Sequence, residues 1–211
     1  MITFVLISCG RLDLLKKTVD SFLKFNTYPI TEFILVDDSG DTDIHDSIRS
    51  MYPDWTLVFE SHRGQIVCID DAYSRVKTPY IFHCEDDWEF IRGGFIEPSL
   101  EVLKYNNWIM QVAICNTHNH PVIPDVYNSN GVDFRMVDDT PDNRWHGFSF
   151  NPALRNIAHW NKVGPFMNIG DYEPTGIKEA VIGEALYQFG YRVAILNDSY
   201  CNHTGYGRHK M

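Results

Sequence analysis

The first 84 residues alternate between short apolar runs and stretches with the spacing of an amphipathic helix, and this alternation limits the possible folds more than any other feature. The predicted elements are strand 2–8, helix 11–25, strand 31–38, helix 42–52, strand 55–61, helix 64–77 and strand 79–84. Strands that alternate with helices form a parallel sheet, because each helix returns the chain across one face of it. The pattern therefore predicts an α/β domain with helices on both faces of the sheet.

The pattern changes after residue 92. The predicted elements there are helix 94–106, strand 108–116, helix 152–163, helix 176–190 and strand 191–196. Residues 117–146 are rich in Asn, Asp, Pro and His and show no periodicity, which is typical of a long functional loop. No linker interrupts the 211 residues, and this length suits one domain with a substantial core.

Charge and cysteine content exclude several classes of protein. The formal net charge is -10, which argues against nucleic acid as a partner, since phosphate backbones are bound by clustered Lys and Arg. The five cysteines are widely spaced and form no Cys-x-x-Cys pair, so we expect neither a disulfide framework nor a zinc ribbon. The first apolar run is too short for a signal peptide or a membrane span. We therefore expect a cytoplasmic protein with no transmembrane segment.

Carboxylates directly follow two of the predicted strands. Asp37 and Asp38 end the second strand, and Glu85, Asp86 and Asp87 end the fourth. The carboxyl ends of parallel strands meet at one edge of a sheet, where open α/β sheets bind their ligands, so we expect the five acids to gather there. This concentration of charge is costly without a cation, and Mn²⁺ or Mg²⁺ prefers carboxylate, phosphate and water oxygens. Asp37 and Asp38 would also fit a solvated turn or a helix cap.

Five segments occur in an order that resembles a known family. They are VLISCGR…L…SF (5–22), ILVDDSGDTD (34–43), RGQIVCIDDAY (63–73), YIFHCEDDWEF (80–90) and VGPF…KEAVIGEALYQFGYRV (163–193). Together they resemble the GT-A fold glycosyltransferases, particularly the inverting family 2 type that uses nucleotide-diphosphosugars. The resemblance implies one GT-A domain over 1–211, with a mostly parallel central sheet flanked by helices. It also implies a nucleotide-sugar-binding half, 1–92, and an acceptor-binding and catalytic half, 93–211. It extends to glycosyltransferase domains of large algal DNA viruses, which would place the protein in the host cytoplasm.

The resemblance implies a nucleotide site at the first two strand ends. The loop formed by Ser8, Cys9, Gly10 and Arg11 would wrap the nucleobase, and Asp38 would accept a hydrogen bond from its imide N–H. Ile69 and Asp70 stand where the family usually has Arg-Asn. Asp70 is still expected to face the nucleotide, with a different hydrogen-bonding role.

The resemblance also implies a metal site at the fourth strand end, where "EDDW" replaces the Asp-x-Asp motif of the family. Asp87 would bind Mn²⁺ or Mg²⁺, and Asp86 or Glu85 would support the ribose or the ion. Glu85 departs from the family, which has Asp at this position. His203 would complete the metal shell, as a C-terminal His does in many GT-A enzymes.

An inverting transfer needs a general base, and the family has an acid pair near the start of its last helix. Counting back from Gly190 places Glu179 at that position. Asp171 and Glu173 are the alternatives, and an acid in a first helical turn can also serve only the helix dipole.

Basic and aromatic side chains complete the predicted site. Arg63 and Arg208 could contribute positive charge to the donor phosphates. Trp88, Trp145 and His146 could contact the acceptor sugar, although aromatic residues are also common in a core. His118 and His120 form at most a weak zinc pair.

Three functions fit these observations. The first is a metal-dependent inverting glycosyltransferase that moves a sugar from a nucleotide-diphosphosugar, with UDP-sugars foremost, to a glycan or other hydroxyl acceptor. The second is a catalytically silent module that binds sugar nucleotide or glycan. The third is a sugar nucleotidyltransferase, against which "SCGRLD" counts because it offers one Gly and one Arg where a Gly-rich basic loop is expected.

Overall fold

The computed structural model describes residues 1–115, 121–138, 145–169 and 178–208. Strands make one large sheet and one small one. The strands are β1 (Ile2–Ser8), β2 (Glu32–Asp37), β3 (Thr56–Phe59), β4 (Tyr80–Glu85), β5 (Trp88–Phe90), β6 (Ile109–Ala113), β7 (Tyr127–Ser129), β8 (Val132–Met136), β9 (Ala153–Asn156), β10 (Arg192–Leu196) and β11 (Cys201–His203). The helices are α1 (Leu12–Phe25), α2 (Thr42–Met51), α3 (Gln65–Arg75), α4 (Ile96–Tyr105), α5 (Ile157–Val163), the 3-10 turn η1 (Phe166–Asn168) and α6 (Lys178–Gln188).

The large sheet has the order β3-β2-β1-β4-β9-β6-β10-β8-β7. The first four of these strands run parallel to one another, as predicted from the β-α alternation. β9 is antiparallel to both β4 and β6, β10 is parallel to β6, and β8 and β7 continue antiparallel. The sheet is therefore mixed, with a parallel half built from the first 85 residues.

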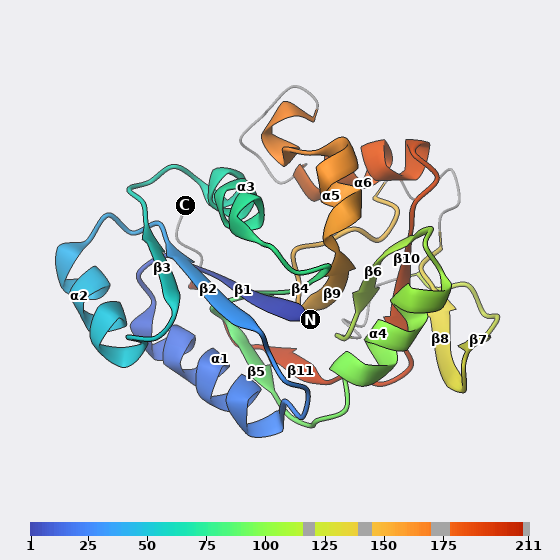
Figure 1. The fold of residues 1–211 in the computed structure, drawn as a ribbon, viewed down its shortest axis with the longest axis horizontal. Coiled ribbons are helices and arrows are strands. Elements are labelled where there is room, and N and C mark those ends of the chain that lie inside the picture. Colours follow the sequence, from blue (N-terminus) through green and yellow to red (C-terminus); the bar gives the residue numbers. More distant parts are fainter. Residues whose placement is uncertain (116–120, 139–144, 170–177, 209–211) are drawn as a thin grey trace.

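Helices cover both faces of the sheet (Figure 1). Along β1, Phe4 and Leu6 point into the core that includes residues of α1 and α4, whereas Val5 and Ile7 point into the core that includes residues of α3 and α6. Alternate residues of a strand face opposite sides, so an unbroken apolar run is what a strand covered on both faces requires.

The second half departs from the sequence prediction at residues 153–156. A helix was expected over 152–163, but Ala153–Asn156 forms β9 and the helix begins only at Ile157. The Asn156 side chain caps α5 by accepting a hydrogen bond from the Ala158 N–H at 2.9 Å. The prediction was wrong because a four-residue apolar strand followed at once by a capped helix has the same spacing as one longer helix.

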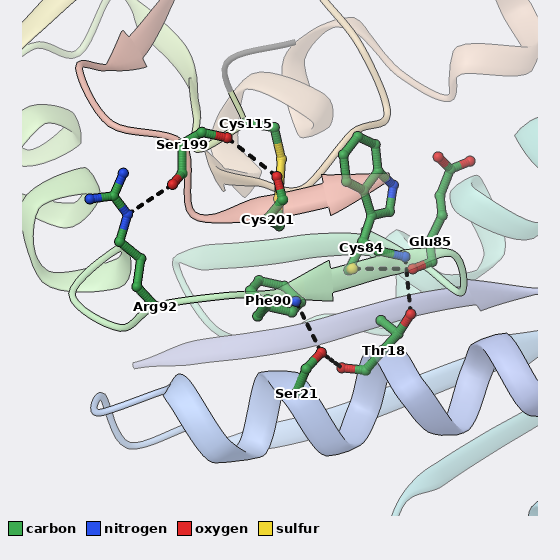
Figure 2. The surroundings of a disulfide bond; sticks show 10 residues. Thr18, Ser21, Cys84, Glu85, Phe90, Arg92, Cys115, Ser199 and Cys201 are labelled. Atoms are coloured by element: carbon green, nitrogen blue, oxygen red, sulfur yellow. Dashed lines mark hydrogen bonds between the residues drawn. A yellow bond between two sulfur atoms is a disulfide. The ribbon is translucent and has the colours of Figure 1, made fainter. Parts of the chain in front are cut away.

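The small sheet pairs β5 with β11, and a disulfide joins Cys115 to Cys201 beside it, with 5.7 Å between the Cα atoms. The backbone N–H groups of Trp88 and Phe90 donate to Thr18 and Ser21 of α1. Figure 2 shows the disulfide on the far side of β5 from α1. One bridge is not the disulfide framework that the cysteine spacing excluded, and the spacing gave no sign of it, because the fold brings together two cysteines 86 residues apart in the sequence.

Across the described ranges, no helix combines the length and apolar character that crossing a lipid bilayer requires.

Candidate functional site

The parallel strands end at a common edge, and the register fixes which residues meet there. Ser8 at the end of β1 pairs with Asp37 of β2, and Ile7 pairs with Glu85 of β4. The acids that follow β2 and β4 are therefore brought to either side of the loop after β1. This confirms the expected geometry, since carboxyl ends of adjacent parallel strands lie side by side.

Asp37 and Asp38 both hold backbone in place. Fully buried Asp37 accepts hydrogen bonds from the N–H groups of Gly10 at 2.9 Å and Ser39 at 3.0 Å. Burial works against ionisation of Asp37, but the hydrogen bonds from Ser39 and Gly10 outweigh it and lower the pKa. Asp38 accepts from the N–H groups of Arg63 at 2.8 Å and Gly64 at 2.7 Å. Asp38 thus ties the loop before α3 to the end of β2.

Asp86 is fully buried and surrounded by donors. Its Oδ2 accepts from the Ser8 hydroxyl at 3.0 Å, the Cys9 N–H at 3.4 Å and the Arg11 Nε at 3.3 Å, and its Oδ1 pairs with Arg11 Nη2. Burial raises the pKa of Asp86, and the charge of Arg11 opposes the rise. Three of the four loop residues predicted around the nucleobase therefore contact Asp86.

Asp87 lies between Arg11 and His203. Its Oδ2 is 3.0 Å from Arg11 Nη1 and 3.3 Å from His203 Nε2. Its Oδ1 is buried and has no hydrogen-bond partner. This is the one carboxylate oxygen among the described residues that is buried without a partner. Asp87 and His203, both predicted to bind the metal, therefore lie side by side.

The chain from Cys201 to Arg208, here called the C-terminal strap, packs onto Asp87. The Thr204 N–H and hydroxyl both donate to the Asp87 carbonyl, at 2.8 and 3.0 Å. A Cβ atom at Gly205 would lie 2.8 Å from the Asp87 Cγ, so any larger residue would force the strap or the Asp87 side chain to shift. Arg208 closes the strap on α1 through two hydrogen bonds to Asp13, at 2.6 and 3.0 Å.

Glu85 and Glu179 share one electrostatic environment. Burial raises the pKa of Glu85 to about 8, and the charges of Asp87, Glu179 and Asp86 add to the rise. Gln65 of α3 donates to the Glu85 carboxylate. Glu179, in the first turn of α6, accepts from the Phe150 N–H at 2.6 Å, and burial raises its pKa as well. The start of α6 therefore lies close enough to the acids of β4 for their charges to interact.

Asp70 has an environment unlike the expected one. Its Oδ1 accepts from the Trp160 Nε1 at 2.8 Å and the Phe166 N–H at 2.9 Å, and its Oδ2 accepts from the Met167 N–H at 2.9 Å. These three bonds join α3 to α5 and to η1. We therefore assign Asp70 to packing between the two halves and do not retain it as a donor ligand.

The predicted acceptor residues lie in three different environments. Trp88 is only 3 % exposed and packs in the core with its ring 5.0 Å from that of His203, so it offers no surface to a sugar. His146 stacks at 4.0 Å on Tyr187 and its Nε2 is 2.8 Å from Glu184, further along α6 than Glu179. Trp145 is half-buried, and its carbonyl lies against Gly183 of α6.

The remaining predicted residues are one exposed arginine and four residues outside the described ranges. Arg63 is exposed and pairs with Glu60 at 3.2 Å. Asp171, Glu173, His118 and His120 lie outside the described residues.

Sequence reasoning missed several residues that shape the site. Gln65, Thr204 and Gly205 contact Glu85 or Asp87 directly, and Phe150 contacts Glu179 through its backbone. Only "HTGYG" (203–207) carried a usable signal, because two glycines beside His203 indicate a close backbone approach.

A divalent ion fits the residues at Asp87, although they do not form a complete cage. Among the described residues no three His, Cys, Asp or Glu side chains are grouped so as to hold a metal ion. The unpartnered Oδ1 of Asp87, with His203 beside its Oδ2, nevertheless offers oxygen and nitrogen ligands of the right type. The remaining ligands of such an ion would have to come from water or from a bound phosphate.

Comparisons with solved structures identify the fold. The mannosyltransferase PcManGT from Pyrobaculum calidifontis, solved with GDP-Man and Mn²⁺, superposes with a TM-score of 0.68 at 14% identity, covering 98% of this chain and 57% of that one. TarS 1–349 from S. aureus, solved with UDP-GlcNAc, gives 0.68 at 13% identity, with 99% and 61% covered. The chain thus spans about three fifths of these structures, and it shares their α/β GT-A fold, with helices around a large central sheet whose first four strands are parallel.

Comparisons of sequence give a family but no individual relative. A search of curated proteins found no significant match. The model of glycosyl transferase family 2, in contrast, matches residues 3–161, which include β1 to β4 with the acids at their ends. Because this match covers well over half of the 211 residues, the chain belongs to glycosyl transferase family 2.

Proposed function

We propose that this chain is an inverting glycosyltransferase that moves a sugar from a nucleotide-diphosphosugar to a hydroxyl group of a glycan or another acceptor. The observation that carries the proposal is that Glu179, at the start of α6, lies within electrostatic range of the acids that end β4, because its charge, with that of Asp87, adds to the effect of burial in raising the pKa of Glu85. Family membership supports the reaction class. The residues 1–92 would bind the donor and 93–211 the acceptor.

The donor side of the proposed site is already fixed in place. The loop from Ser8 to Arg11 is held by Asp37 and Asp86, and Asp38 holds the loop at Arg63 and Gly64. Both Asp38 oxygens accept backbone hydrogen bonds, and each can accept one more, so contact with a nucleobase N–H remains chemically open. Such preorganisation lowers the cost of ordering the loops when a nucleotide binds.

Asp87 and His203 would hold a divalent cation, Mn²⁺ or Mg²⁺. When bound, the ion would supply positive charge to the diphosphate that leaves. The mannosyltransferase from Pyrobaculum calidifontis was solved with Mn²⁺ and a nucleotide-sugar, which makes Mn²⁺ the first ion to test.

Glu179 would act as the general base. Its carboxylate takes the proton of the acceptor hydroxyl while that oxygen forms a bond to the anomeric carbon and the bond from that carbon to the diphosphate breaks. Burial raises the pKa of Glu179 above its usual value, and a carboxylate with a raised pKa accepts a proton more readily at neutral pH. The Phe150 N–H bond to Oε1 leaves Oε2 to face the acceptor.

The test is release of nucleoside diphosphate from a panel of UDP- and GDP-sugars in the presence of Mn²⁺, with and without simple sugar acceptors. We expect slow hydrolysis of one donor in the panel and its loss in Asp87→Asn, because the substitution removes an anionic metal ligand. Asp54→Asn, an exposed position, is the matched control and should behave like the parent. Donor binding without any release of nucleoside diphosphate, with every acceptor tried, would instead identify a silent binding module.

A further inference from the structure

Arg11 forms ion pairs with both Asp86 and Asp87. Nη2 contacts the Asp86 Oδ1, and Nη1 lies 3.0 Å from the Asp87 Oδ2. The Arg11 side chain is 12% exposed, and those of Asp86 and Asp87 are 1% and 6% exposed. A guanidinium between two buried carboxylates occupies the electrostatic position in which a metal ion would be expected.

Asp86 and Asp87 differ in how many hydrogen bonds and ion pairs they accept from Arg11 and its neighbours. Asp86 receives hydrogen bonds from Ser8, Cys9 and two nitrogens of Arg11. Asp87 shares its Oδ2 between Arg11 and His203, while its buried Oδ1 has no partner among the described residues. A buried, unpartnered carboxylate oxygen is costly, so Asp87 is the member of the pair that gains from a second cation.

Arg11 can release Asp87 without releasing Asp86. Its Nε and Nη2 bond to Asp86, whereas only Nη1 reaches Asp87. The same Nη1 donates to the Arg208 carbonyl at 3.3 Å, at the end of the C-terminal strap. A rotation that withdraws Nη1 would therefore expose Asp87 to a new partner and change one contact of the strap.

We propose that Arg11 is the resident counter-ion of the Asp86 and Asp87 pair and that a divalent cation must compete with it for Asp87. The inference deepens the proposed function, on which it rests, because it concerns the same ion. In the metal-free protein Arg11 neutralises both carboxylates. When an ion binds, Arg11 keeps its two bonds to Asp86 and leaves Asp87 to the metal.

The experiment measures Mn²⁺ affinity without any donor, from the electron paramagnetic resonance signal of free Mn²⁺. In Arg11→Met the competing charge is gone, so Mn²⁺ should bind tighter than in the parent by about tenfold or more. Arg75→Met is the matched control, because it removes one positive charge from an exposed pair with Asp71 on α3. That variant has the same net charge as Arg11→Met and should bind Mn²⁺ as the parent does.

A second variant and a second readout cover the case in which Arg11→Met does not fold. Arg11→Lys keeps the charge but cannot span two carboxylates with a planar fork, so it should bind Mn²⁺ more tightly than the parent and more weakly than Arg11→Met. Mn²⁺ should also raise the melting temperature of Arg11→Lys more than that of the parent. Equal or weaker Mn²⁺ binding in both Arg11 variants would overturn the inference.

The outcomes separate this inference from the proposed function. If the parent releases nucleoside diphosphate with Mn²⁺ while the Arg11 variants bind the ion no tighter, only the counter-ion role fails. If neither the parent nor the variants bind Mn²⁺, the counter-ion role fails together with metal dependence. Donor turnover that persists in the presence of a chelator would then show that the chain is a transferase that does not need the ion.

Discussion

Asp37, at the end of β2, and Glu179, at the start of α6, are held in opposite ways. Asp37 accepts hydrogen bonds from Gly10 and Ser39, and these bonds lower its pKa. Glu179 accepts one hydrogen bond, from Phe150, and burial raises its pKa. A carboxylate that fixes loops must stay ionised, whereas a carboxylate that exchanges a proton needs open lone pairs and a pKa closer to neutral. The difference is what the proposed function requires, a rigid donor side and a reactive acceptor side.

Removal of the Glu179 carboxylate should give the largest effect. We expect Glu179→Gln to lower the rate of sugar transfer by about 10²- to 10⁴-fold, because an amide cannot take the acceptor proton. Binding of the nucleotide-sugar, measured by calorimetry with Mn²⁺, should change little. Glu101→Gln on α4, in an exposed pair with Lys104, is the control. Full transfer activity in Glu179→Gln would assign the base to another acid, with Asp171 the first alternative.

The next largest effect is expected on protein stability, from a substitution of Asp70. This acid packs α3 against α5 and η1, unlike the acids of the proposed site. Asp70→Asn turns an acceptor of three hydrogen bonds into a group that can satisfy only some of them. We expect the free energy of unfolding to fall by about 3 kcal/mol, measured by urea denaturation, with activity per folded molecule unchanged.

The adjacent position supplies a control for this change. Asp71→Asn removes an exposed pair with Arg75 and should change stability by less than about 1 kcal/mol. A specific loss of donor binding in folded Asp70→Asn would restore the nucleotide-facing role predicted from the sequence.

The sequence predicted the parallel half well and the second half poorly, for physical reasons. β1 to β4 and α1 to α3 have long, regular periods that local patterns capture. β5 and β11 are three residues each and exist because they pair with each other. The hairpin of β7 and β8 was missed although Asn130 and Gly131, both at positive φ, form its two-residue turn. Asn-Gly is a strong hairpin signal, and it was lost among many other polar residues.

The residues of the candidate site divide in the same way, into those that local sequence patterns reveal and those that depend on the whole fold. The strand-end acids and Arg11 could be found because their positions follow from strand ends, and His203 because the family implies it. Trp88 and Asp70 could not be placed, because the direction of a side chain at the start of a three-residue strand or inside a helix depends on tertiary packing. The Cys115–Cys201 bridge also depends on the whole fold.

A smaller effect should follow from crowding the C-terminal strap against Asp87. In Gly205→Ala the added methyl group meets the Asp87 carboxylate, so the strap must shift. We expect a loss of about 1 to 2 kcal/mol in stability and weaker donor binding in the presence of Mn²⁺. Asn202→Ala, an exposed position on β11, should change neither. Unaltered melting temperature and donor affinity in Gly205→Ala would show that the strap does not restrain Asp87.

The smallest expected effect is on the pH dependence of transfer, which also tests the contrast between the proposed donor and acceptor sides. Glu179 must be ionised to act as a base, so kcat/KM should fall as the pH drops through its pKa. Because burial raises that pKa, the acid limb should lie above pH 4.5, the ordinary value for Glu. Measurements at saturating Mn²⁺ hold the occupancy of the proposed metal site constant across the pH range. The residual activity of Glu179→Gln should lack this limb. An acid limb at or below pH 4.5 in the parent would mean that Glu179 is not the group that titrates, and the acceptor side would then be no more reactive than the donor side.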